Sequence, residues 1–536
     1  MIRYSCFDGY LDLRGKNYRV FGDTRNKKFS IRSLPDNREI LGLRLSISFD
    51  GNSPETPEIK PRLADAVNGM ESFSLTFENE TVTMTICFRY DSVALFSTLK
   101  RSMPRCVESV VLCGGSRNAA QEIVNPAPQP MPYHRFPITE EQSIVPFLAS
   151  PPPWIFSYES PGGGECWSAS LEPDPDKLWF DGFHHLPDGA GTCGWKITLP
   201  KCEPETGGLV LPPLVFRFGN KGIFDALERH VEALRQEGKV SFPKQQFPAW
   251  HSGISACTWR FQSKEPRRDQ ATQQNCEKYV KLLEDHGLSF DILIIDDSWQ
   301  KAHSLWEPEP CKWNDLRGFI DSQHKRGRHV LLWLSTWADG LPDEMKIDNY
   351  WNVEAPELRD RLRQMAHQML SSEAGCYNAD GVKFDFTCCM PKDFKQLRYK
   401  GNAYLLERFR LLAEVLLEAK PDAVLDFQCC NPYFSRFQTM LRLNDYFGLP
   451  ENGLAEMRFR ATIARIVAPG SIIDTDHIGF SQFSYRGGLN FFRECDSFGA
   501  QSWYLGPQDL EDPELLAILK EQSRKALTAE KKESIL

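Results

Sequence analysis

The sequence has no apolar run that approaches the ~18 residues a membrane-spanning helix needs, so we expect no membrane partner. Its first residues, MIRYSCFDGYLDLRGKNYRV, lack a charged segment followed by an apolar run, so no secretory signal is expected. None of the 16 cysteines forms a C-x-x-C pair, which argues against a structural zinc site. Together these absences predict a cytoplasmic protein with reduced thiols.

Positive charge is also in short supply. The net charge is −9, and no basic patch is interleaved with aromatic residues, which excludes nucleic acid as the expected partner. A chain of 536 residues is too long for one hydrophobic core, so two or three domains are expected. The charged fraction of 25% and the hydrophobic fraction of 41% are those of an ordinary globular protein. Such a protein can also form a homo-oligomer.

Residues 1–222 read as short strands separated by turns. FSLTFENETVTMTICFRY, residues 73–90, alternates apolar and polar side chains around an Asn-Glu turn and predicts a hairpin. Proline and glycine interrupt the other strand-like runs, which is typical of an antiparallel β-sandwich domain. A helical pattern, IFDALERHVEALRQEG, begins at residue 223, and we interpret residues 223–245 as a linker helix.

From residue 246 to 536 the rhythm becomes strand, loop and helix. Eight apolar runs are spaced along this half: SGISACTW, FDILIIDD, HVLLWLST, DGVKFDF, AVLDFQCC, LRLND, SIIDTD and AQSWYLG. Helical patterns separate most of them, which predicts a catalytic (β/α)8 TIM barrel. An open doubly wound sheet is the alternative, but no Gly-rich phosphate loop follows an early strand.

Charged residues end several of these predicted strands. They are Asp296 and Asp297 on the second strand, Lys383 and Asp385 on the fourth, Asp445 on the sixth, and Asp474 and Asp476 on the seventh. Any one of them could be a helix cap or a salt-bridge partner. So many acids at the carboxyl ends of barrel strands predict a site, because those ends share one mouth.

Two kinds of hydrolysis suit such a mouth. A retaining glycosidase needs a nucleophilic and a proton-donating carboxyl group about 5 to 5.5 Å apart. Asp385 and Asp445 are 60 residues apart, the length of two successive strand–helix units. The alternative is a divalent-metal site built from Asp474, Asp476 and His477. No second histidine ends a nearby strand, so we expect no metal and no cofactor.

The motifs also carry a resemblance. CTWRF, ILIIDDSWQ, HVLLWLSTW, DGVKFDF, RLNDYF and DTDHIGF occur in this order between about residues 250 and 510. The set resembles the barrel motifs of glycoside hydrolase family 36 in clan D, the retaining α-galactosidase and raffinose-synthase-like enzymes. The resemblance implies an α-galactosidase acting on an oligosaccharide or glycoside with a terminal α-linked sugar.

The resemblance also implies roles for individual residues. Asp385 would be the nucleophile and Asp445 the acid/base, while Asp296 and Asp297 would bind sugar hydroxyls. Lys383 lies two residues before Asp385, hence on the same side of the strand, where its charge would keep Asp385 ionised. The remaining expected substrate-site residues are Arg442 beside Asp445, Asp474 and Asp476 at the pocket floor, and Trp259, Trp299, Trp333 and Trp337 as pocket walls. Plain core packing is the alternative for each tryptophan.

The sequence departs from the family at three places. Ser298 stands where the family has glycine, Arg260 where the plant enzymes have aspartate, and CCNPYF replaces a Cys-Ser-Gly-Gly-Gly run at the fifth strand. These departures leave three alternatives to an α-galactosidase. They are a related enzyme for another sugar, such as an α-N-acetylgalactosaminidase; a transglycosylase of raffinose-synthase type; and a barrel that binds carbohydrate without catalysis.

Overall fold

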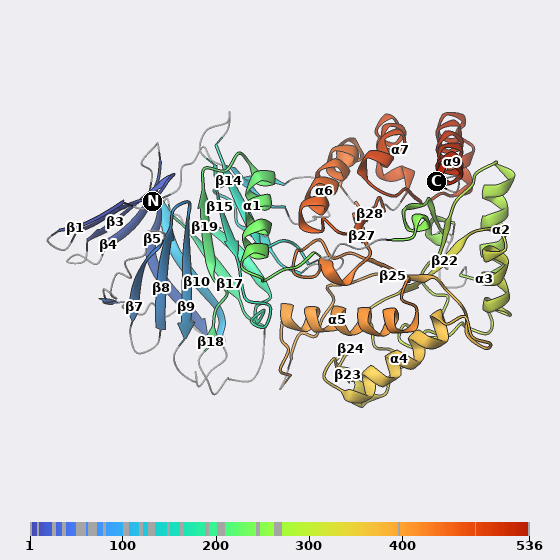
Figure 1. The fold of residues 1–536 in the computed structure, drawn as a ribbon, viewed down its shortest axis with the longest axis horizontal. Helices are drawn as coiled ribbons and strands as arrows, with labels where there is room; N and C mark the ends of the chain where they lie inside the picture. The colour runs from blue at the N-terminus through green and yellow to red at the C-terminus, as the bar shows by residue number, and fades with distance from the viewer. Residues whose placement is uncertain are drawn as a thin grey trace.

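The structure is a computed structural model. It describes residues 3–7, 10–23, 28–34, 39–49, 60–62, 72–78, 82–99, 107–116, 122–126, 134–146, 151–160, 166–187, 192–200, 209–242, 247–261, 271–394, 397–446, 448–476 and 479–533. Figure 1 shows a β-sandwich and a barrel side by side, with the N-terminus in the sandwich and the C-terminus on the barrel.

The sandwich consists of two antiparallel sheets. One has the order β1 (Arg3–Phe7), β2 (Tyr10–Arg14), β3 (Tyr18–Asp23), β4 (Lys28–Ser33), β5 (Glu39–Phe49), β10 (Val107–Ser116), β17 (Thr192–Thr198), β16 (Gly182–Pro187) and β13 (Gln142–Ile144). The other has the order β12 (Arg135–Pro137), β11 (Glu122–Val124), β14 (Ile155–Glu159), β15 (Cys166–Leu171), β19 (Leu214–Phe218), β9 (Ser92–Leu99), β8 (Val82–Arg89), β7 (Ser72–Glu78) and β6 (Lys60–Arg62), and β18 (Leu209–Val210) pairs with β9.

The alternating sequence pattern explains how the two sheets pack. β7 and β8 pair antiparallel across the predicted hairpin, which is confirmed. Aromatic side chains fill the space between the sheets: Tyr158 stacks on Trp167 at 3.9 Å, and Trp195 meets Phe216 edge-on at 4.9 Å. Pairs of this kind stabilise a core beyond the area they bury.

The second half forms a parallel barrel sheet, as predicted. Its order is β28 (Ile472–Asp474), β27 (Met440–Arg442), β26 (Val424–Phe427), β25 (Gly381–Phe384), β22 (His329–Leu334), β21 (Ile292–Ile295), β20 (Ser255–Cys257) and β29 (Ser502–Trp503). The Ala500 amide donates to Ile473 O at 2.7 Å, and the Thr475 amide donates to Ala500 O at 3.0 Å. These bonds bring the two edge strands together, so the barrel prediction is confirmed and the open sheet is wrong.

Helices surround the barrel and cover one side of the sandwich. They are α1 (Ile223–Gln236), α2 (Gln273–Asp285), α3 (Leu316–His324), α4 (Pro356–Leu370), α5 (Asn402–Ala419), α6 (Gly453–Val467), α7 (Tyr485–Phe498), α8 (Pro507–Leu510) and α9 (Pro513–Glu533). Short 3-10 helices are η1 (Ala249–Ser252), η2 (Thr258–Arg260), η4 (Asp343–Met345), η5 (Ser435–Phe437), η6 (Pro450–Asn452) and η7 (Phe480–Gln482), and β23 (Lys346–Ile347) pairs with β24 (Tyr350–Trp351). η5 alone stands between β26 and β27, where an α-helix would complete the regular repeat.

Period-two alternation divides each barrel strand into an inner and an outer face. Ile292, Ile294, Leu331, Val424 and Met440 belong to a small cluster of their own inside the barrel. Their sequence neighbours, such as Leu293 and Val330, join the large core beneath the helices. Residues two or four positions further along each strand therefore point toward the same inner space at the carboxyl end.

The sandwich and the barrel are joined by side chains that bind backbone carbonyls. Asn402 Nδ2 donates to Phe180 O at 2.7 Å, Asn431 Nδ2 to Pro152 O at 2.6 Å, and the Tyr433 hydroxyl to Pro173 O at 2.7 Å. Asn431 and Tyr433 belong to the CCNPYF departure, so that segment holds the sandwich. α1 packs against α6, and Figure 1 shows it on the side of the sandwich that faces the barrel.

Two observations bear on the expected setting of the protein. No disulfide joins the cysteines whose side chains the structure describes, among them Cys257 and Cys429. No helix in the described ranges combines the length and apolar character that crossing a membrane requires.

Candidate active site

Several of the predicted site residues meet at the barrel mouth because they share the inner parity of their strands. Asp296 follows Ile292 and Ile294 by this count, and Asp385 follows Gly381 and Lys383. By the same rule, Arg442 follows Met440. Arg442 and Asp474 are also direct neighbours across β27 and β28. The structure therefore gathers residues from strands far apart in the sequence.

A buried ion pair links β25 to the loop after β21. Lys383 Nζ lies 2.6 Å from Asp296 Oδ2, and Cys257 Sγ donates to the same oxygen at 2.9 Å. The Lys383 side chain is 3% exposed. Burial alone would lower the pKa of Lys383, but Asp296 raises it, so the lysine keeps its charge. Lys383 therefore forms its ion pair with Asp296, whereas the sequence predicted that its charge would act on Asp385.

Arg442 supplies the cation next to Asp385. Its Nη1 is 3.5 Å from Asp385 Oδ1, its Nε donates to Asp476 Oδ2 at 2.7 Å, and its side chain is 1% exposed. Burial tends to lower the pKa of Arg442, but Asp476 and Asp385 raise it well above its ordinary value. One guanidinium therefore bridges the fourth and seventh strands. Its charge also acts on Asp445, whose pKa it tends to lower.

Asp385 faces hydrogen-bond donors and a cation. The Trp333 indole donates to its Oδ2 at 3.2 Å, and the Phe386 amide donates to its Oδ1 at 2.9 Å. Its side chain is 21% exposed, so the carboxylate reaches the solvent side of the mouth. Two N–H groups and a guanidinium therefore hold this side chain in one orientation at the mouth.

Asp445 lies near other acids. It is half-buried, and burial, followed by the charges of Asp476 and Asp385, raises the pKa of Asp445 to about 7. Arg442 opposes this rise without cancelling it. One carboxyl group thus faces N–H donors and a cation, whereas the other lies among acids, and a nucleophile and an acid require such a contrast in surroundings.

Asp474 and Asp476 lie deeper than Asp445, and both are buried. Burial and the charge of Asp476 raise the pKa of Asp474 to about 7. Burial would also raise the pKa of Asp476, but Arg442 and Lys383 lower it. By its pKa, Asp474 is as suitable a proton donor as Asp445. It differs from Asp445 in burial, because Asp474 is fully buried and Asp445 is half-buried.

Asp426 on β26 belongs to the site although the sequence analysis did not single it out. It is buried, and within the described part of the chain neither carboxylate oxygen has a hydrogen-bond partner. Burial and the charge of Asp474 raise the pKa of Asp426 well above its ordinary value. Its inner parity with Val424 in the run AVLDFQCC is the signal that could have found it.

Asp297 points away from Asp296 and toward a histidine. Its side chain is 24% exposed, and its Oδ1 lies 3.7 Å from His303 Nε2. His303 Nδ1 pairs with Asp339 at 2.8 Å. Burial lowers the pKa of His303, but Asp297 and Asp339 outweigh it and raise the pKa. His303 and Asp339 are the other site residues that the sequence analysis missed, since nothing in their local sequence marks them.

The four expected aromatic residues occupy different depths. Trp337 is half-buried and faces Phe386 at 4.5 Å, and Trp259 is half-buried beside the inner cluster. Trp333 is buried with its indole on Asp385. Trp299 is fully buried, and its indole donates to Trp333 O at 2.8 Å. Trp299 thus lies in the core and holds the strand that carries Trp333.

Three residues beside the site carboxyl groups adopt left-handed backbone conformations. Ser298 has φ 73°, Phe386 has φ 53° and Asn444 has φ 72°. Such conformations cost non-glycine residues free energy and persist where the surroundings impose them. Ser298 stands where family 36 has glycine, so the departure keeps the turn at an energetic cost. Asn444 ends the strand alternation immediately before Asp445.

The alternative metal site concerns the run DTDH. Asp474 and Asp476 are described, whereas His477 lies outside the described residues. Within the ranges given above, no three His, Cys, Asp or Glu side chains are grouped to hold a metal ion.

Arg260, which stands where the plant family 36 enzymes have aspartate, is 22% exposed. Its Nε lies 3.8 Å from Asp509 Oδ2, so the arginine has a salt-bridge partner.

Comparisons with known proteins concern the fold. No protein-family model and no curated protein sequence matches the chain. The α-galactosidase from Lactobacillus brevis is similar with TM-score 0.52 and 12% identity over 98% of this chain and 83% of its own. The cycloalternan-degrading enzyme from Trueperella pyogenes gives 0.55 and 11% over 96% and 82%. A family 31 α-xylosidase from a soil metagenome gives 0.53 and 11% over 98% and 76%. The chain therefore has the sandwich-and-barrel fold of these enzymes, which confirms the expected fold, while membership of clan D and of family 36 stays a prediction.

Proposed function

We propose that this chain is a retaining α-glycosidase in which Asp385 is the nucleophile and Asp445 is the acid/base. The observation that carries the proposal is the contrast between their environments at one barrel mouth. Two N–H donors and Arg442 surround the Asp385 carboxyl group. Burial and neighbouring acids raise the pKa of Asp445 to about 7, so that it holds a proton near neutral pH.

The proposed reaction has two displacements. In the first, an Asp385 oxygen attacks the anomeric carbon while Asp445 gives its proton to the departing glycosidic oxygen. A covalent glycosyl–Asp385 ester forms and the aglycone leaves. In the second, the Asp445 carboxylate takes a proton from water, whose oxygen attacks the same carbon and releases Asp385. Configuration is retained because each displacement inverts it.

The surrounding residues suggest how the sugar would be held. Asp297 and His303 reach the solvent side of the mouth and offer an acceptor and a donor to hydroxyl groups. The half-buried Trp337 can pack against the C–H face of a sugar ring. The deeper Asp296–Lys383 pair would bind a hydroxyl or fix the strand ends. The proposed sugar-contacting set otherwise keeps Trp259, Trp333, Arg442, Asp474 and Asp476.

An α-linked galactoside is the first substrate class we propose, because the motif set resembles family 36. The similar solved structures carry names that cover galactosides, xylosides and cycloalternan, so the sugar itself must be tested. We also propose the division into residues 1–222, 223–245 and 246–536. A cytoplasmic location is supported by the free thiols.

The experiment is a panel of 4-nitrophenyl α-glycosides that differ only in the sugar: galactoside, N-acetylgalactosaminide, xyloside and glucoside. We expect release of nitrophenolate from the galactoside, with the α-anomer of galactose as the first product by NMR. Turnover of another member alone would reassign the sugar. Transfer to an added sugar acceptor in preference to water would identify a transglycosylase. Calorimetric binding of galactose without any turnover would identify a binding barrel and overturn the proposal.

A further inference from the structure

A single buried arginine holds the backbone that leads up to and includes the proposed acid/base. Arg460 on α6 donates from Nη1 to Leu443 O at 3.0 Å, Asn444 O at 2.9 Å and Asp445 O at 3.1 Å. We call residues 443–445 the Asp445 segment. Three successive carbonyls directed at one guanidinium nitrogen fix the course of this segment, in which Asn444 is left-handed.

Glu456, one turn earlier on α6, holds Arg460 in place. Arg460 Nε donates to Glu456 Oε1 at 2.5 Å, and both side chains are buried. Burial would raise the pKa of Glu456, but Arg460 and His134 lower it, so the carboxylate stays charged. A buried charge pair of this kind depends on every partner, because removing one leaves the other uncompensated.

The third partner comes from the sandwich, more than 300 residues away in sequence. His134 Nε2 lies 2.7 Å from Glu456 Oε2, and its Nδ1 lies 2.8 Å from Asn125 O. Its ring stacks on Phe459 of α6 at 4.0 Å. The imidazole is therefore held from both nitrogens and one face, and it connects the end of β11 with the helix that carries Arg460.

We infer that His134, Glu456 and Arg460 are positioning residues through which the sandwich fixes the geometry of the proposed acid/base. The inference rests on the proposed role of Asp445. Without the His134 contact, Glu456 and Arg460 can reorient, and the Asp445 segment loses its three-point support. Because proton donation requires the acid within hydrogen-bond reach of the leaving oxygen, a displacement of about 1 Å can cost about 100-fold in rate.

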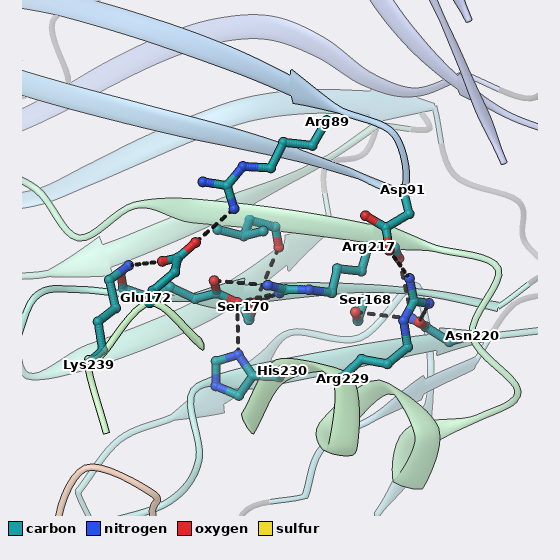
Figure 2. Close-up of polar contacts among 12 residues, drawn as sticks. Arg89, Asp91, Ser168, Ser170, Glu172, Arg217, Asn220, Arg229, His230 and Lys239 are labelled. Carbon is teal, nitrogen blue, oxygen red and sulfur yellow. Dashed lines mark hydrogen bonds and ion pairs between the residues drawn. The ribbon is translucent and has the colours of Figure 1, made fainter. Parts of the chain in front are cut away.

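A second buried cluster of Glu, Arg and His serves as a matched control for His134, Glu456 and Arg460. Figure 2 shows Glu172, Arg217 and His230, the same three residue types, buried between β15, β19 and α1. Arg217 Nη2 donates to Glu172 Oε2 at 3.0 Å, and His230 Nδ1 lies 2.9 Å from Glu172 Oε1. These contacts do not include the Asp445 segment. Removing His230 should therefore disturb a buried Glu–Arg pair without moving the acid.

The experiment compares His134→Ala, His134→Gln and His230→Ala with the wild type on two α-galactosides. One has an alkyl leaving group that needs a proton, and the other has a dinitrophenyl group that needs little. We expect His134→Ala to slow the alkyl substrate about 10- to 100-fold more than the dinitrophenyl one. His134→Gln should restore most of the difference, because its amide can still donate to Glu456. His230→Ala should lower Tm without changing the ratio of the two rates.

Backbone hydrogen exchange provides a readout that does not depend on turnover. Amides of the Asp445 segment should exchange faster in His134→Ala and not in His230→Ala. If His134→Ala does not fold, Arg460→Lys replaces it, because an ammonium cannot reproduce the guanidinium geometry.

An unchanged rate ratio in an active, folded variant, or unchanged exchange of the segment, would overturn the inference and leave the proposed function standing. A wild-type protein that turns over no α-glycoside would instead overturn the proposed function.

Discussion

Asp445→Asn tests the assignment of the acid most directly, because the amide has nearly the same shape and cannot donate an acidic proton. Loss of general-acid catalysis typically costs about 100- to 10,000-fold, or about 3 to 5 kcal/mol of transition-state stabilisation. We expect a loss of this size for alkyl α-galactosides. Dinitrophenyl galactosides should keep their first step within about tenfold, since their leaving group needs little protonation.

The pH dependence follows from the raised pKa of Asp445. The first displacement needs the protonated acid, so wild-type kcat/KM should fall as pH rises through about 7. The rise in pKa from 3.8 to about 7 corresponds to about 4 kcal/mol at most. The folded state keeps this proton where the unfolded state has lost it, so the contribution to stability is full below about pH 4 and is lost as pH rises to about 7. Asp445→Asn should therefore gain Tm relative to the wild type at pH 8 and gain little at pH 4.

Asp474→Asn is the companion variant, because the pKa of Asp474 is also about 7. Rates for both leaving groups between pH 5 and 8, with Tm measured by calorimetry, decide between the two residues. We expect a uniform loss for Asp474→Asn, since a buried residue at the floor would affect binding of every substrate. A leaving-group-dependent loss in Asp474→Asn together with a uniform loss in Asp445→Asn would refute this reasoning and move the acid to the seventh strand.

Three further outcomes are expected. Asp385→Gly should fold and lose turnover, and azide should restore some release of an activated leaving group; a residual rate above about a hundredth of the wild type, a loss of less than about 3 kcal/mol, would contradict the nucleophile. Activity should survive EDTA, because proton transfer and attack by carboxyl groups need no Lewis acid; loss on chelation, reversed by one divalent ion, would favour the DTDH metal site. Asp426→Asn should keep activity, because the amide has nearly the shape of the protonated carboxyl group that the raised pKa of Asp426 favours, and it should raise Tm more at high pH than at low pH; inactivity with an intact fold would show that the carboxyl group itself is required.

Much of the barrel and its mouth could be predicted because the signals are local. An apolar run followed at even spacing by an acid places Asp296, Asp385 and Asp474 on the inner face before any tertiary contact is known. The same rule would have found Asp426. The register between strands is not local, and it decides that Arg442 approaches Asp385 while Lys383 pairs with Asp296.

Contacts between distant segments left no trace in the sequence pattern. Arg460 and Glu456 read as an ordinary surface pair at helical spacing, yet both are buried. His134 lies in a Pro-rich stretch without periodicity, and its partner is 322 residues away. The tryptophans illustrate the same limit, since all four belong to the same motif set, yet Trp299 and Trp333 are fully buried whereas Trp259 and Trp337 are half-buried.

The bond between His134 and Glu456 also has a consequence for how the chain is made. The partners are 322 residues apart, and at about 5 to 20 residues per second a ribosome needs about 16 to 64 s to reach the second after the first. The sandwich has time to fold before α6 is synthesised, so the edge that carries His134 can form before Glu456 is present. If His134 positions the Asp445 segment as we infer, this half of the mouth is completed only after α6 has been synthesised.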